Sequence, residues 1–375
     1  MKLQILQDKL KEGLKIIERI SLKSLTLPIL NNVFISAEKN LINLAATDLE
    51  VGINWWALAK IDKDGKTTIP CHLISSFVNL LPNEKITIRG ENNNLFIECK
   101  NYKTQLKGVS AEEFPIIPKI TDSEFITINS GLFCSSLKQV TDIPLPSSSR
   151  PEISGIYLSF KKDLIIITAT DSFRLGEKKI FLKNNSFLKK NYILIIPQKT
   201  AKEVINIFEN KEGDAKIYFS SNQIMFESQM QETTHPQIQV VSRLIDGEYP
   251  DYQKIIPEKF TTQIILDKTE FLNQVKSASL FTGKTSEIKI KTSARDKEIT
   301  VLSQSQEIGD YQSSIPVKIE GEDAEIAFNH KFLLDGILNI KSSEIILELN
   351  GDSGPGVLKP VGDQSYIYVV MPIKN

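Results

Sequence analysis

The sequence has little of what metal sites and disulfide frameworks require. It contains three cysteines and three histidines in 375 residues. Cys71, Cys99 and Cys134 are widely spaced and form no C-x-x-C pair. This odd, scattered set indicates neither a disulfide framework nor a zinc site, and it fits reduced thiols in a cytosolic protein. Because there is also no H-E-x-x-H motif and no close cluster of ligand residues, we expect no metal ion or other cofactor.

Long apolar runs and an excess of one charge are also absent. Apolar runs, such as residues 164–167 and 192–196, are far shorter than the ~18 residues that a membrane-spanning helix needs. The N-terminus has no apolar region of the signal-peptide kind. Lys plus Arg number 45 and Asp plus Glu 46, a net charge of -1, so the whole chain shows no basic excess typical of nucleic-acid binding. We therefore expect a cytoplasmic protein, in which only the distribution of charge can reveal a charged partner.

Motifs for catalysis are missing or incomplete. There is no G-x-S-x-G elbow. Gly283-Lys284-Thr285 matches the end of a phosphate-binding loop, but Ala278 stands where that motif requires glycine. Asp48 and Asp171, each preceded by threonine, could serve as an acid and base pair, but their place in a repeat favours a role in turns. The sequence therefore predicts that the chain is not an enzyme.

Internal repeats are the strongest positive signal in the sequence. Residues 33–50 and 156–173 both follow a strand, turn, strand pattern that includes Ala-Thr-Asp, and residues 288–305 keep the alternation without the Thr-Asp pair. A second marker, Glu-Phe-Pro at residues 113–115, returns as Glu-Tyr-Pro at 248–250. Both spacings are close to one third of the chain. They predict three similar domains, which cover residues 1–122, 123–256 and 257–375.

Each repeat also contains two helical patterns among alternating, strand-like segments. The first is expected at residues 6–20, 130–140 and 269–281, and the second at 72–81, 198–209 and 330–340. Asp267, followed three positions later by Glu270, predicts a capping box. Strand-rich repeats with two helices each indicate the α+β class, with helices packed on one face of antiparallel sheets.

Basic residues follow the side of two predicted helices that lies opposite the apolar side. They are Lys11, Lys15 and Arg19 in the first helix and, in a weaker pattern, Lys199 and Lys202 in residues 198–209. Taken alone, such stripes are more often ordinary solvated faces than ligand sites. The pattern by itself leaves both interpretations open.

Five motifs at the hinges of the repeats carry a resemblance to a known family. They are Thr26-Leu-Pro-Ile-Leu30, Ala46-Thr-Asp-Leu-Glu50, Ala169-Thr-Asp-Ser-Phe-Arg-Leu175, Asp246-Gly-Glu-Tyr-Pro-Asp-Tyr252 and Tyr368-Val-Val-Met-Pro372. In this order and spacing, the chain resembles the bacterial DNA polymerase III β subunit, the sliding clamp, from end to end. The resemblance implies the DNA-clamp fold, in which two chains of three similar domains close head to tail into a ring around duplex DNA. It also implies a processivity factor that tethers the replicative polymerase, whose DNA-directed DNA polymerase activity belongs to the assembly.

The resemblance assigns a DNA-facing role to the basic helix residues. In the family the paired helices line the hole, so Lys11, Lys15, Arg19, Lys199 and Lys202 would face phosphates. Such contacts are independent of sequence and sensitive to salt. Lys23 and Arg150 occupy loops that correspond to DNA-contacting loops of the family, and Ser24 replaces a basic residue of some members.

The resemblance further implies a pocket between the central and C-terminal domains that docks short motifs of partner proteins. Its wall would consist of Ile153, Thr170, Ser172, Phe173, Arg174, Leu175, Pro250, Ile255, Val369, Met371 and Pro372, with Asn329 and Phe332 at its border. An apolar groove with a flexible methionine suits peptides with aromatic or leucine anchors. Two departures bear on peptide preference: Phe173 replaces the His of some members, and the chain ends in Ile373-Lys374-Asn375 instead of the more common Met-Arg-Leu.

Ring closure requires contacts between the first domain of one chain and the third domain of another. The candidates are Leu106 in the strand 102–107 and the helix end Leu280-Phe281, through edge-strand pairing and an apolar patch. The implied partners are duplex DNA, a second copy, the polymerase α subunit, a clamp-loader ATPase and other proteins with clamp motifs, at the nucleoid. Two alternatives remain: a monomeric three-repeat peptide-binding scaffold that encircles nothing, and a nucleotide hydrolase that uses Gly283-Lys284-Thr285.

Overall fold

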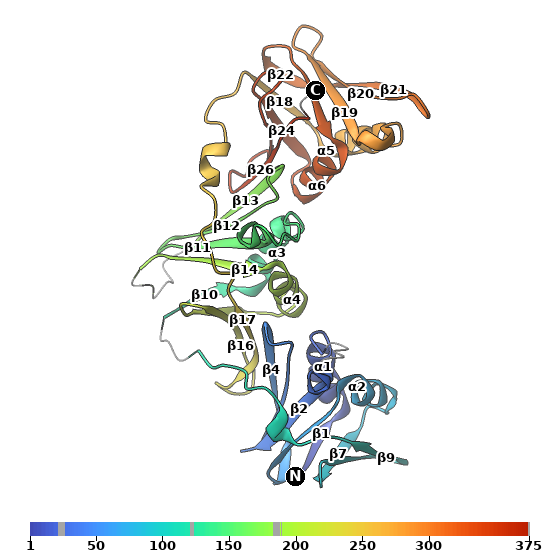
Figure 1. Cartoon of the computed structure of the whole chain (residues 1–375), viewed down its shortest axis with the longest axis vertical. Helices are drawn as coiled ribbons and strands as arrows, with labels where there is room; N and C mark the ends of the chain where they lie inside the picture. The colour runs from blue at the N-terminus through green and yellow to red at the C-terminus, as the bar shows by residue number, and fades with distance from the viewer. Residues whose placement is uncertain (22–26, 121–123, 183–187, 189, 374–375) are drawn as a thin grey trace. The chain divides into compact units, whose positions relative to one another are not determined.

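The computed structural model describes residues 1–21, 27–120, 124–182, 188 and 190–373 (Figure 1). Lys23 and Ser24 lie outside the described residues. The chain divides into two compact units. The first comprises residues 1–134, 185–189 and 199–244, and the second comprises residues 135–184, 190–198 and 245–375. Each unit contains complete β-sheets, so the architecture of each can be followed by itself.

The same order of elements occurs three times: a strand, a helix, a group of strands, a second helix and three final strands. The first repeat consists of β1 (Lys2–Leu6), α1 (Gln7–Ile17), β2 (Asn32–Glu38), β3 (Leu41–Thr47), β4 (Val51–Leu58), β5 (Lys60–Lys63), β6 (Gly65–Pro70), α2 (Cys71–Leu80), β7 (Lys85–Glu91), β8 (Asn94–Cys99) and β9 (Tyr102–Lys107). The second consists of β10 (Phe125–Asn129), α3 (Ser130–Thr141), β11 (Gly155–Phe160), β12 (Leu164–Thr170), β13 (Arg174–Phe181), β14 (Tyr192–Pro197), α4 (Gln198–Phe208), β15 (Asp214–Phe219), β16 (Gln223–Gln229) and β17 (Pro236–Arg243). The third consists of β18 (Thr262–Asp267), α5 (Lys268–Ser279), β19 (Glu287–Ser293), β20 (Glu298–Ser305), β21 (Gly309–Pro316), β22 (Lys318–Gly321), β23 (Glu325–Asn329), α6 (His330–Asn339), β24 (Glu344–Leu349), β25 (Gly356–Pro360) and β26 (Tyr366–Val370).

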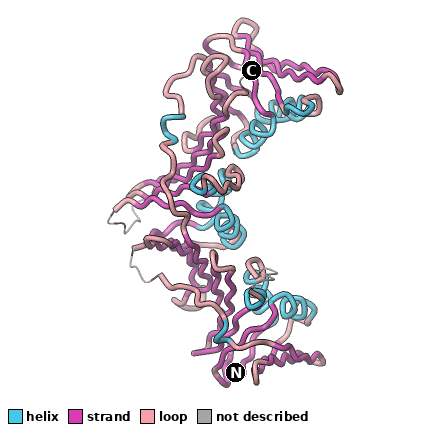
Figure 2. Tube along the Cα trace, viewed as in Figure 1, coloured by secondary structure: helices cyan, strands magenta, loops and turns pink. Residues whose placement is uncertain are grey.

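The first unit is built on two antiparallel sheets. Their strand orders are β10-β15-β16-β17-β4-β3-β2-β6 and β5-β1-β7-β8-β9. Strand β4 of the first repeat pairs with β17 of the second, with Gly52 opposite Val241. Helices α1 and α2 pack together (Figures 1 and 2). Gly13 lets α1 approach the sheet closely, because a Cβ at this position would lie 2.5 Å from the fully buried ring of Trp55.

The second unit repeats this plan. Its sheets have the strand orders β14-β11-β12-β13-β26-β25-β24-β18-β22 and β21-β20-β19-β23. Strand β13 of the second repeat pairs with β26 of the third, with Leu175 opposite Val369. Helices α5 and α6 pack together, and Gly336 of α6 lies against the buried ring of Tyr368. In both units, therefore, a sheet continues from one repeat into the next.

The predicted α+β class and the predicted helices are confirmed. All six helical segments form, and their ends differ from the expected positions by about three residues at most. The Asp267 carboxylate accepts a hydrogen bond from the Glu270 amide at 2.8 Å and caps α5 as expected. The threefold order of elements agrees with the repeat, whereas the boundaries at residues 122 and 256 stay predictions.

Candidate functional site

A tight turn between β12 and β13 begins the candidate site. The Asp171 Oδ1 atom accepts hydrogen bonds from the amides of Phe173 and Arg174, both at 3.0 Å. Ser172 between them has a φ of 78° in the left-handed region. The first repeat forms the same turn after β3, where Asp48 Oδ1 accepts from the amides of residues 50 and 51 at 2.9 and 2.7 Å. Both aspartates thus have the predicted role in turns, in which the carboxylate replaces missing backbone partners.

Arg174 fixes this turn to helix α6. Its Nε atom donates to Asp171 Oδ2 at 2.9 Å, and its Nη1 atom donates to Asp335 of α6. The guanidinium also lies 4.8 Å from the centre of the Phe332 ring. Burial lowers the pKa of Arg174, but Tyr368, Asp171 and Asp335 outweigh burial and raise it, so the group stays charged. With the side chain 6% exposed, this charge stabilises the turn.

Phe173 projects beside this anchor and forms an exposed aromatic surface. Its side chain is 60% exposed, and its ring stacks on Phe332 with 6.3 Å between centroids and 21° between planes. The Met371 amide donates to the Phe173 carbonyl at 2.8 Å, and the Ile373 amide donates to the Ala327 carbonyl at 2.8 Å. The C-terminal segment therefore lies against the turn. Exposed aromatic rings beside a methionine can accommodate apolar anchors of different shapes.

Leu175 and Val369 lie in the sheet beside the turn. They face each other across β13 and β26 and are 2% and 1% exposed. Both belong to a buried cluster with Tyr249 and Tyr252. Tyr252 follows Pro250 on the connector between the second and third repeats and donates from its hydroxyl to Glu177 Oε2 at 2.6 Å. These contacts make this part of the sheet rigid, because each side chain is held from several directions.

The remaining predicted residues of this site lie around the turn in different environments. Ile255 is 43% exposed, while Pro250 and Pro372 are half-buried. Thr170 is buried and donates to the Arg174 carbonyl at 2.8 Å. Ile153 is buried in the 3-10 helix η3 (Pro151–Ser154), which packs against β11 and β12. Asn329 caps α6 by accepting a hydrogen bond from the Lys331 amide at 3.0 Å.

Two residues that hold the site were not predicted from the sequence. Asp335 anchors Arg174, and Glu177 anchors Tyr252. They lie 161 and 75 residues along the chain from their partners, and neither belongs to a motif. A charged residue at a buried strand position, as at Glu177 in β13, is the one signal that could have identified a buried partner.

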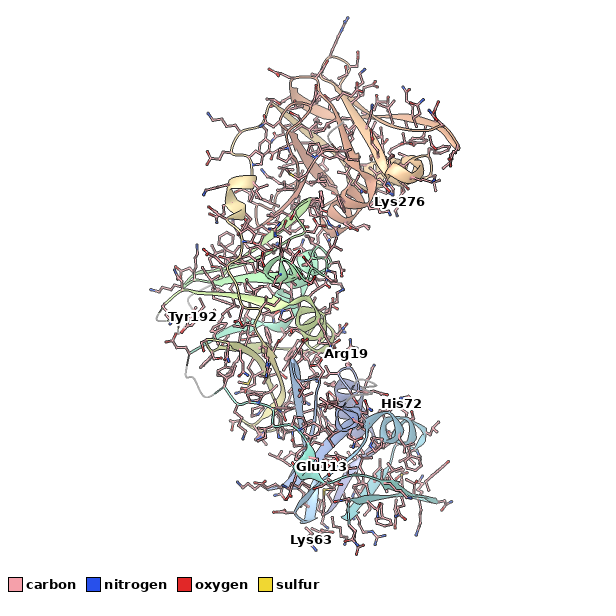
Figure 3. The ribbon with its side chains drawn as sticks, viewed as in Figure 1. Arg19, Lys63, His72, Glu113, Tyr192 and Lys276 are labelled. Carbon is pink, nitrogen blue, oxygen red and sulfur yellow. The ribbon has the colours of Figure 1, made fainter. Side chains whose placement is uncertain are left out.

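The basic residues of α1 are exposed, as the helical pattern predicts. Lys11 and Lys15 lie on the solvent side of α1, whereas Arg19, expected within the helix, is exposed in the turn two residues beyond its end at Ile17. Arg19 is labelled in Figure 3. Its Nε atom lies 2.6 Å from Glu203 Oε2 of α4. Lys199 is half-buried and forms an ion pair with Asp48. Carboxylates therefore reduce the positive charge at two of these positions.

Two other DNA-facing candidates also lie at the surface. Lys202 is exposed on α4. Arg150 is exposed in the loop before η3, where its Nη1 atom donates to Ser172 Oγ at 3.3 Å and its Nε atom lies 3.6 Å from Glu152. Its contact with Ser172 brings Arg150 beside the turn that begins the candidate site.

The candidate interface residues lie near two strands at the ends of sheets. Strands β9 and β21 are each terminal in the strand orders of the described chain. Leu106 of β9 is 5% exposed and faces inward, whereas Leu280 after α5 is 70% exposed. Phe281 stacks on Tyr311 of β21 with 5.7 Å between centroids. An exposed leucine thus lies close to an unpaired strand edge, a combination typical of a surface that binds another chain.

Other kinds of site have no support in the described residues. No group of three or more His, Cys, Asp or Glu there could hold a metal ion. Gly283-Lys284-Thr285 forms a short 3-10 turn that follows helix α5, whereas a phosphate-binding loop lies between a strand and a helix. No helix in the described part of the chain is long and apolar enough to cross a membrane.

Comparisons with known proteins agree along the whole chain. Residues 1–118, 128–251 and 253–374 match, in this order, the N-terminal, central and C-terminal domains of the DNA polymerase III beta subunit. The beta sliding clamp of Staphylococcus aureus is 27% identical over 360 residues, which is 93% of each chain. The structure of the DNA polymerase sliding clamp from Bacillus subtilis has a TM-score of 0.93 at 25% identity and covers 100% of this chain and 99% of that one. The DNA polymerase III beta subunit of Thermotoga maritima shares the fold, with a TM-score of 0.90 at 24% identity over 100% of this chain and 99% of that one.

Proposed function

Since this chain belongs to the DNA polymerase III beta subunit family, we propose that two copies close head to tail into a ring that slides along duplex DNA. The chain is a DNA polymerase processivity factor and a non-catalytic accessory subunit. It binds DNA, a second copy of itself and polymerase or other clamp partners. Processivity follows from topology, because a closed ring around duplex DNA can slide along the duplex but cannot dissociate sideways from it.

The continuation of sheets between repeats is the observation that carries the ring proposal. Strand β4 pairs with β17 of the next repeat, and β13 pairs with β26 of the next repeat. The corresponding strand of the third repeat, β21, ends its sheet, and so does β9, the last strand of the first repeat. A second copy can supply both missing neighbours, so that β21 of one chain pairs with β9 of the other. Head-to-tail contacts of this kind generate a closed ring when the rotation closes.

The basic helix faces support the proposal that the ring holds DNA loosely. Lys11 and Lys15 are exposed and have positions suited to phosphate contacts. Arg19 and Lys199 are compensated by Glu203 and Asp48, which weakens their attraction for DNA. We assign the same DNA-facing role to Lys23, Arg150 and Lys202. Weak contacts independent of sequence let a protein move along DNA, which a sliding clamp requires.

The surface around Phe173 is the proposed docking pocket for partner peptides. We assign to it an aromatic or leucine anchor of the polymerase α subunit, and of other replication and repair proteins, over the rigid floor of Leu175 and Val369. A clamp-loader ATPase must open the ring, since a closed ring cannot pass onto circular DNA. The proposed location is the cytoplasm, at the nucleoid, and the proposed function needs no cofactor.

A topological experiment tests the ring directly. The protein is loaded onto a nicked circular plasmid by a bacterial clamp-loader ATPase with ATP. The complex is separated from free protein by gel filtration and then treated with a restriction enzyme that cuts once. We expect the protein to leave the linear DNA by sliding off its ends, while it stays on the uncut circle. Retention on linear DNA, or a stable monomer in sedimentation at micromolar concentration, would instead support the monomeric peptide-binding scaffold, which the family relatives do not favour.

A further inference from the structure

The two junctions between repeats have the same framework of side chains. At the first junction, Phe34 of β2 lies opposite Ala45 of β3, and Ala45 lies opposite Asn54 of β4. At the second junction, the same register places Tyr157 opposite Thr168 and Thr168 opposite Glu177. Each position of one junction therefore has a known counterpart at the other, and Asn54 corresponds to Glu177.

At the second junction the connector between repeats fills the space over this framework. The ring of Tyr157 lies 5.1 Å from that of Tyr249 and 5.8 Å from that of Tyr252. The Tyr252 hydroxyl reaches Glu177 at 2.6 Å. Tyr249 and Tyr252 are 8% and 4% exposed. Two aromatic rings of the connector thus pack over this part of the sheet.

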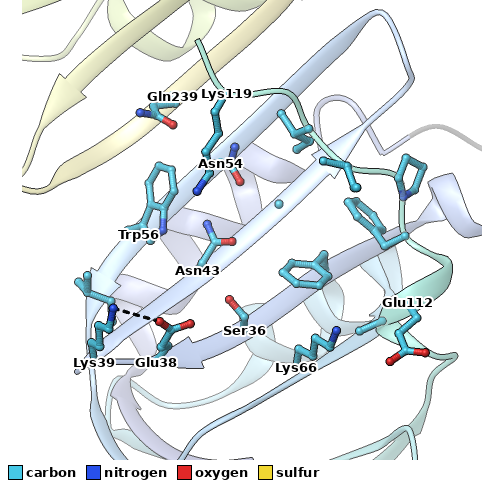
Figure 4. Close-up of a pocket in the computed structure, with 18 of the residues that line it drawn as sticks. Ser36, Glu38, Lys39, Asn43, Asn54, Trp56, Lys66, Glu112, Lys119 and Gln239 are labelled. Atoms are coloured by element: carbon cyan, nitrogen blue, oxygen red, sulfur yellow. Dashed lines mark ion pairs between the residues drawn. The ribbon is translucent and has the colours of Figure 1, made fainter. Parts of the chain in front are cut away.

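At the first junction the stretch between the two prolines of the connector, Pro115 and Pro118, is shorter than the stretch from Pro250 to Pro257 and contains no second aromatic ring. Phe114 takes the place of Tyr249, and its ring lies 5.4 Å from that of Phe34. Pro115 is followed at once by Ile116, whereas residues 251–254, which include Tyr252, separate Pro250 from Ile255. The space that remains is a groove of about 840 Å³, which Phe34, Ala45, Asn54, Phe114 and Ile116 help to line (Figure 4). Ile116 at its border is 92% exposed.

The polar groups of this groove favour an acidic ligand. Among the described residues, three exposed lysines line it, Lys39, Lys66 and Lys119, whereas only two carboxylates do, those of Glu38 and Glu112 (Figure 4). Lys39 forms an ion pair with Glu38 at 3.5 Å. The net charge of the side chains that line the groove is therefore positive, and a positive surface attracts acidic groups.

Amide groups lie at the place that corresponds to Glu177. Asn54 and Gln239 face each other across β4 and β17, and both line the groove. An amide can donate to or accept from a hydroxyl group. Trp56 provides further aromatic surface, with its ring 5.3 Å from that of His235.

We propose that this groove is a second docking site, which binds an acidic segment of a partner protein through a tyrosine side chain. The tyrosine ring would lie over Phe34 as Tyr252 lies over Tyr157, and its hydroxyl would bond to Asn54. Flanking acidic residues would contact Lys66 and Lys119. This site is separate in residues from the proposed pocket at Phe173 and Met371, and it depends on neither ring closure nor that pocket.

The chain itself supplies a probe for this site. A synthetic peptide with the sequence of residues 246–257, Asp-Gly-Glu-Tyr-Pro-Asp-Tyr-Gln-Lys-Ile-Ile-Pro, is acidic and contains both tyrosines. Binding to the full-length protein is followed by tryptophan fluorescence, to which Trp56 in the groove responds while Trp55 is fully buried. The matched control peptide has serine in place of both tyrosines.

We expect saturable binding that weakens roughly tenfold when the tyrosines are replaced, because the aromatic anchor supplies most of the affinity. The variant Lys66→Glu/Lys119→Glu should weaken binding by a similar factor, whereas Lys60→Glu/Lys63→Glu, which changes exposed lysines of β5, should not. Phe173→Ala/Met371→Ala should bind the peptide normally. The proposal is overturned if no saturable binding occurs, if the serine peptide binds equally well, if Phe173→Ala/Met371→Ala removes binding, or if the groove takes single-stranded oligonucleotides and not the peptide.

Discussion

At the scale of single residues, the proposed pocket combines one rigid and one adaptable part. Arg174 is buried, and its hydrogen bonds to Asp171 and Asp335 hold the turn in place. Phe173, next to it, is largely exposed. A fixed backbone that presents an exposed aromatic side chain is suited to bind a peptide with little reorganisation. The contact energy is therefore expected at Phe173 and Met371, and the geometry is set by Arg174.

The double variant Phe173→Ala/Met371→Ala tests this division of roles. We expect it to keep the dimer and the folded structure but to lose stimulation of the polymerase, because truncated anchors at the centre of an interface cost about 2 kcal/mol or more. The measurement is primer extension at limiting polymerase, with Ile193→Ala as the control variant, because Ile193 of β14 is also an exposed apolar residue, at 64%, and lies outside the proposed sites. Full stimulation by the double variant would show that partners dock elsewhere.

The cysteine side chains give a prediction about pH. Cys71 and Cys134 are fully buried, and burial raises the pKa of each thiol from 9.0 to about 12. From pH 9 to pH 12 the unfolded chain would release protons that the folded chain retains, so these thiols reduce stability as pH rises through that range. Below pH 9 both states carry the proton and the effect vanishes.

Denaturant unfolding measured from about pH 8 to about pH 11 checks the fall in stability, and thiol labelling checks the burial from which it follows. At pH 8.5 we expect a disulfide reagent to leave Cys71 and Cys134 unmodified in the folded protein, because the thiolate is the reactive form and access is blocked. After unfolding in guanidinium chloride both should react fully. Rapid labelling of either residue in the folded protein would mean that its helix opens far more readily than its burial indicates.

At the scale of elements, helix α1 has its apolar residues on one face and its lysines on the opposite face. Leu10 and Leu14 are buried in the first unit, and Lys11 and Lys15 are exposed on the other side. Because the lysines contribute nothing to the core, their charge can be reversed without loss of packing. This makes α1 the clearest place to test the DNA-facing role.

We expect Lys11→Glu/Lys15→Glu to reduce loading onto nicked plasmid and to flatten its dependence on salt. Two lost phosphate contacts would lower the slope of log K against log salt concentration by about 2. Filter binding measures this slope between about 50 and 200 mM salt, where such effects are large. Lys60→Glu/Lys63→Glu of β5 is the matched charge control. An unchanged slope would remove α1 from the DNA-binding surface.

At the scale of the whole molecule, the proposed ring closure uses surfaces that are apolar and unpaired in the single chain. Leu280 is 70% exposed, next to Phe281 and close to the edge strand β21. A carboxylate in a dimer interface loses water without gaining a partner, which costs several kcal/mol. Leu280 is therefore the residue at which one substitution should separate the two copies.

Sedimentation of Leu280→Asp measures this effect. We expect the dimer affinity to fall by roughly a hundredfold, which corresponds to about 2.7 kcal/mol. Leu338→Asp is the matched control, because Leu338 of α6 is also an exposed leucine, at 55%. A Leu280→Asp protein that sediments as an intact dimer would place the interface elsewhere and leave Leu106, which is buried in its own domain, without a role in it.

The sequence by itself determined the features that depend on local order. Helical and alternating periodicity located all six helices, the capping residue Asp267 and the class of the fold, because these patterns arise from neighbours along one chain segment. The turn roles of Asp48 and Asp171 followed from their repeated position. The five hinge motifs were enough to indicate the family.

Only the tertiary structure decided which residues meet across the chain. It paired Arg174 with Asp335, and it placed Lys199 against Asp48. It also showed a groove at the first junction, whose connector has no counterpart of residues 251–254, whereas Tyr252 occupies the corresponding place at the second junction. The physical reason is that burial and ion pairing depend on distances between residues far apart in sequence, which no local pattern specifies.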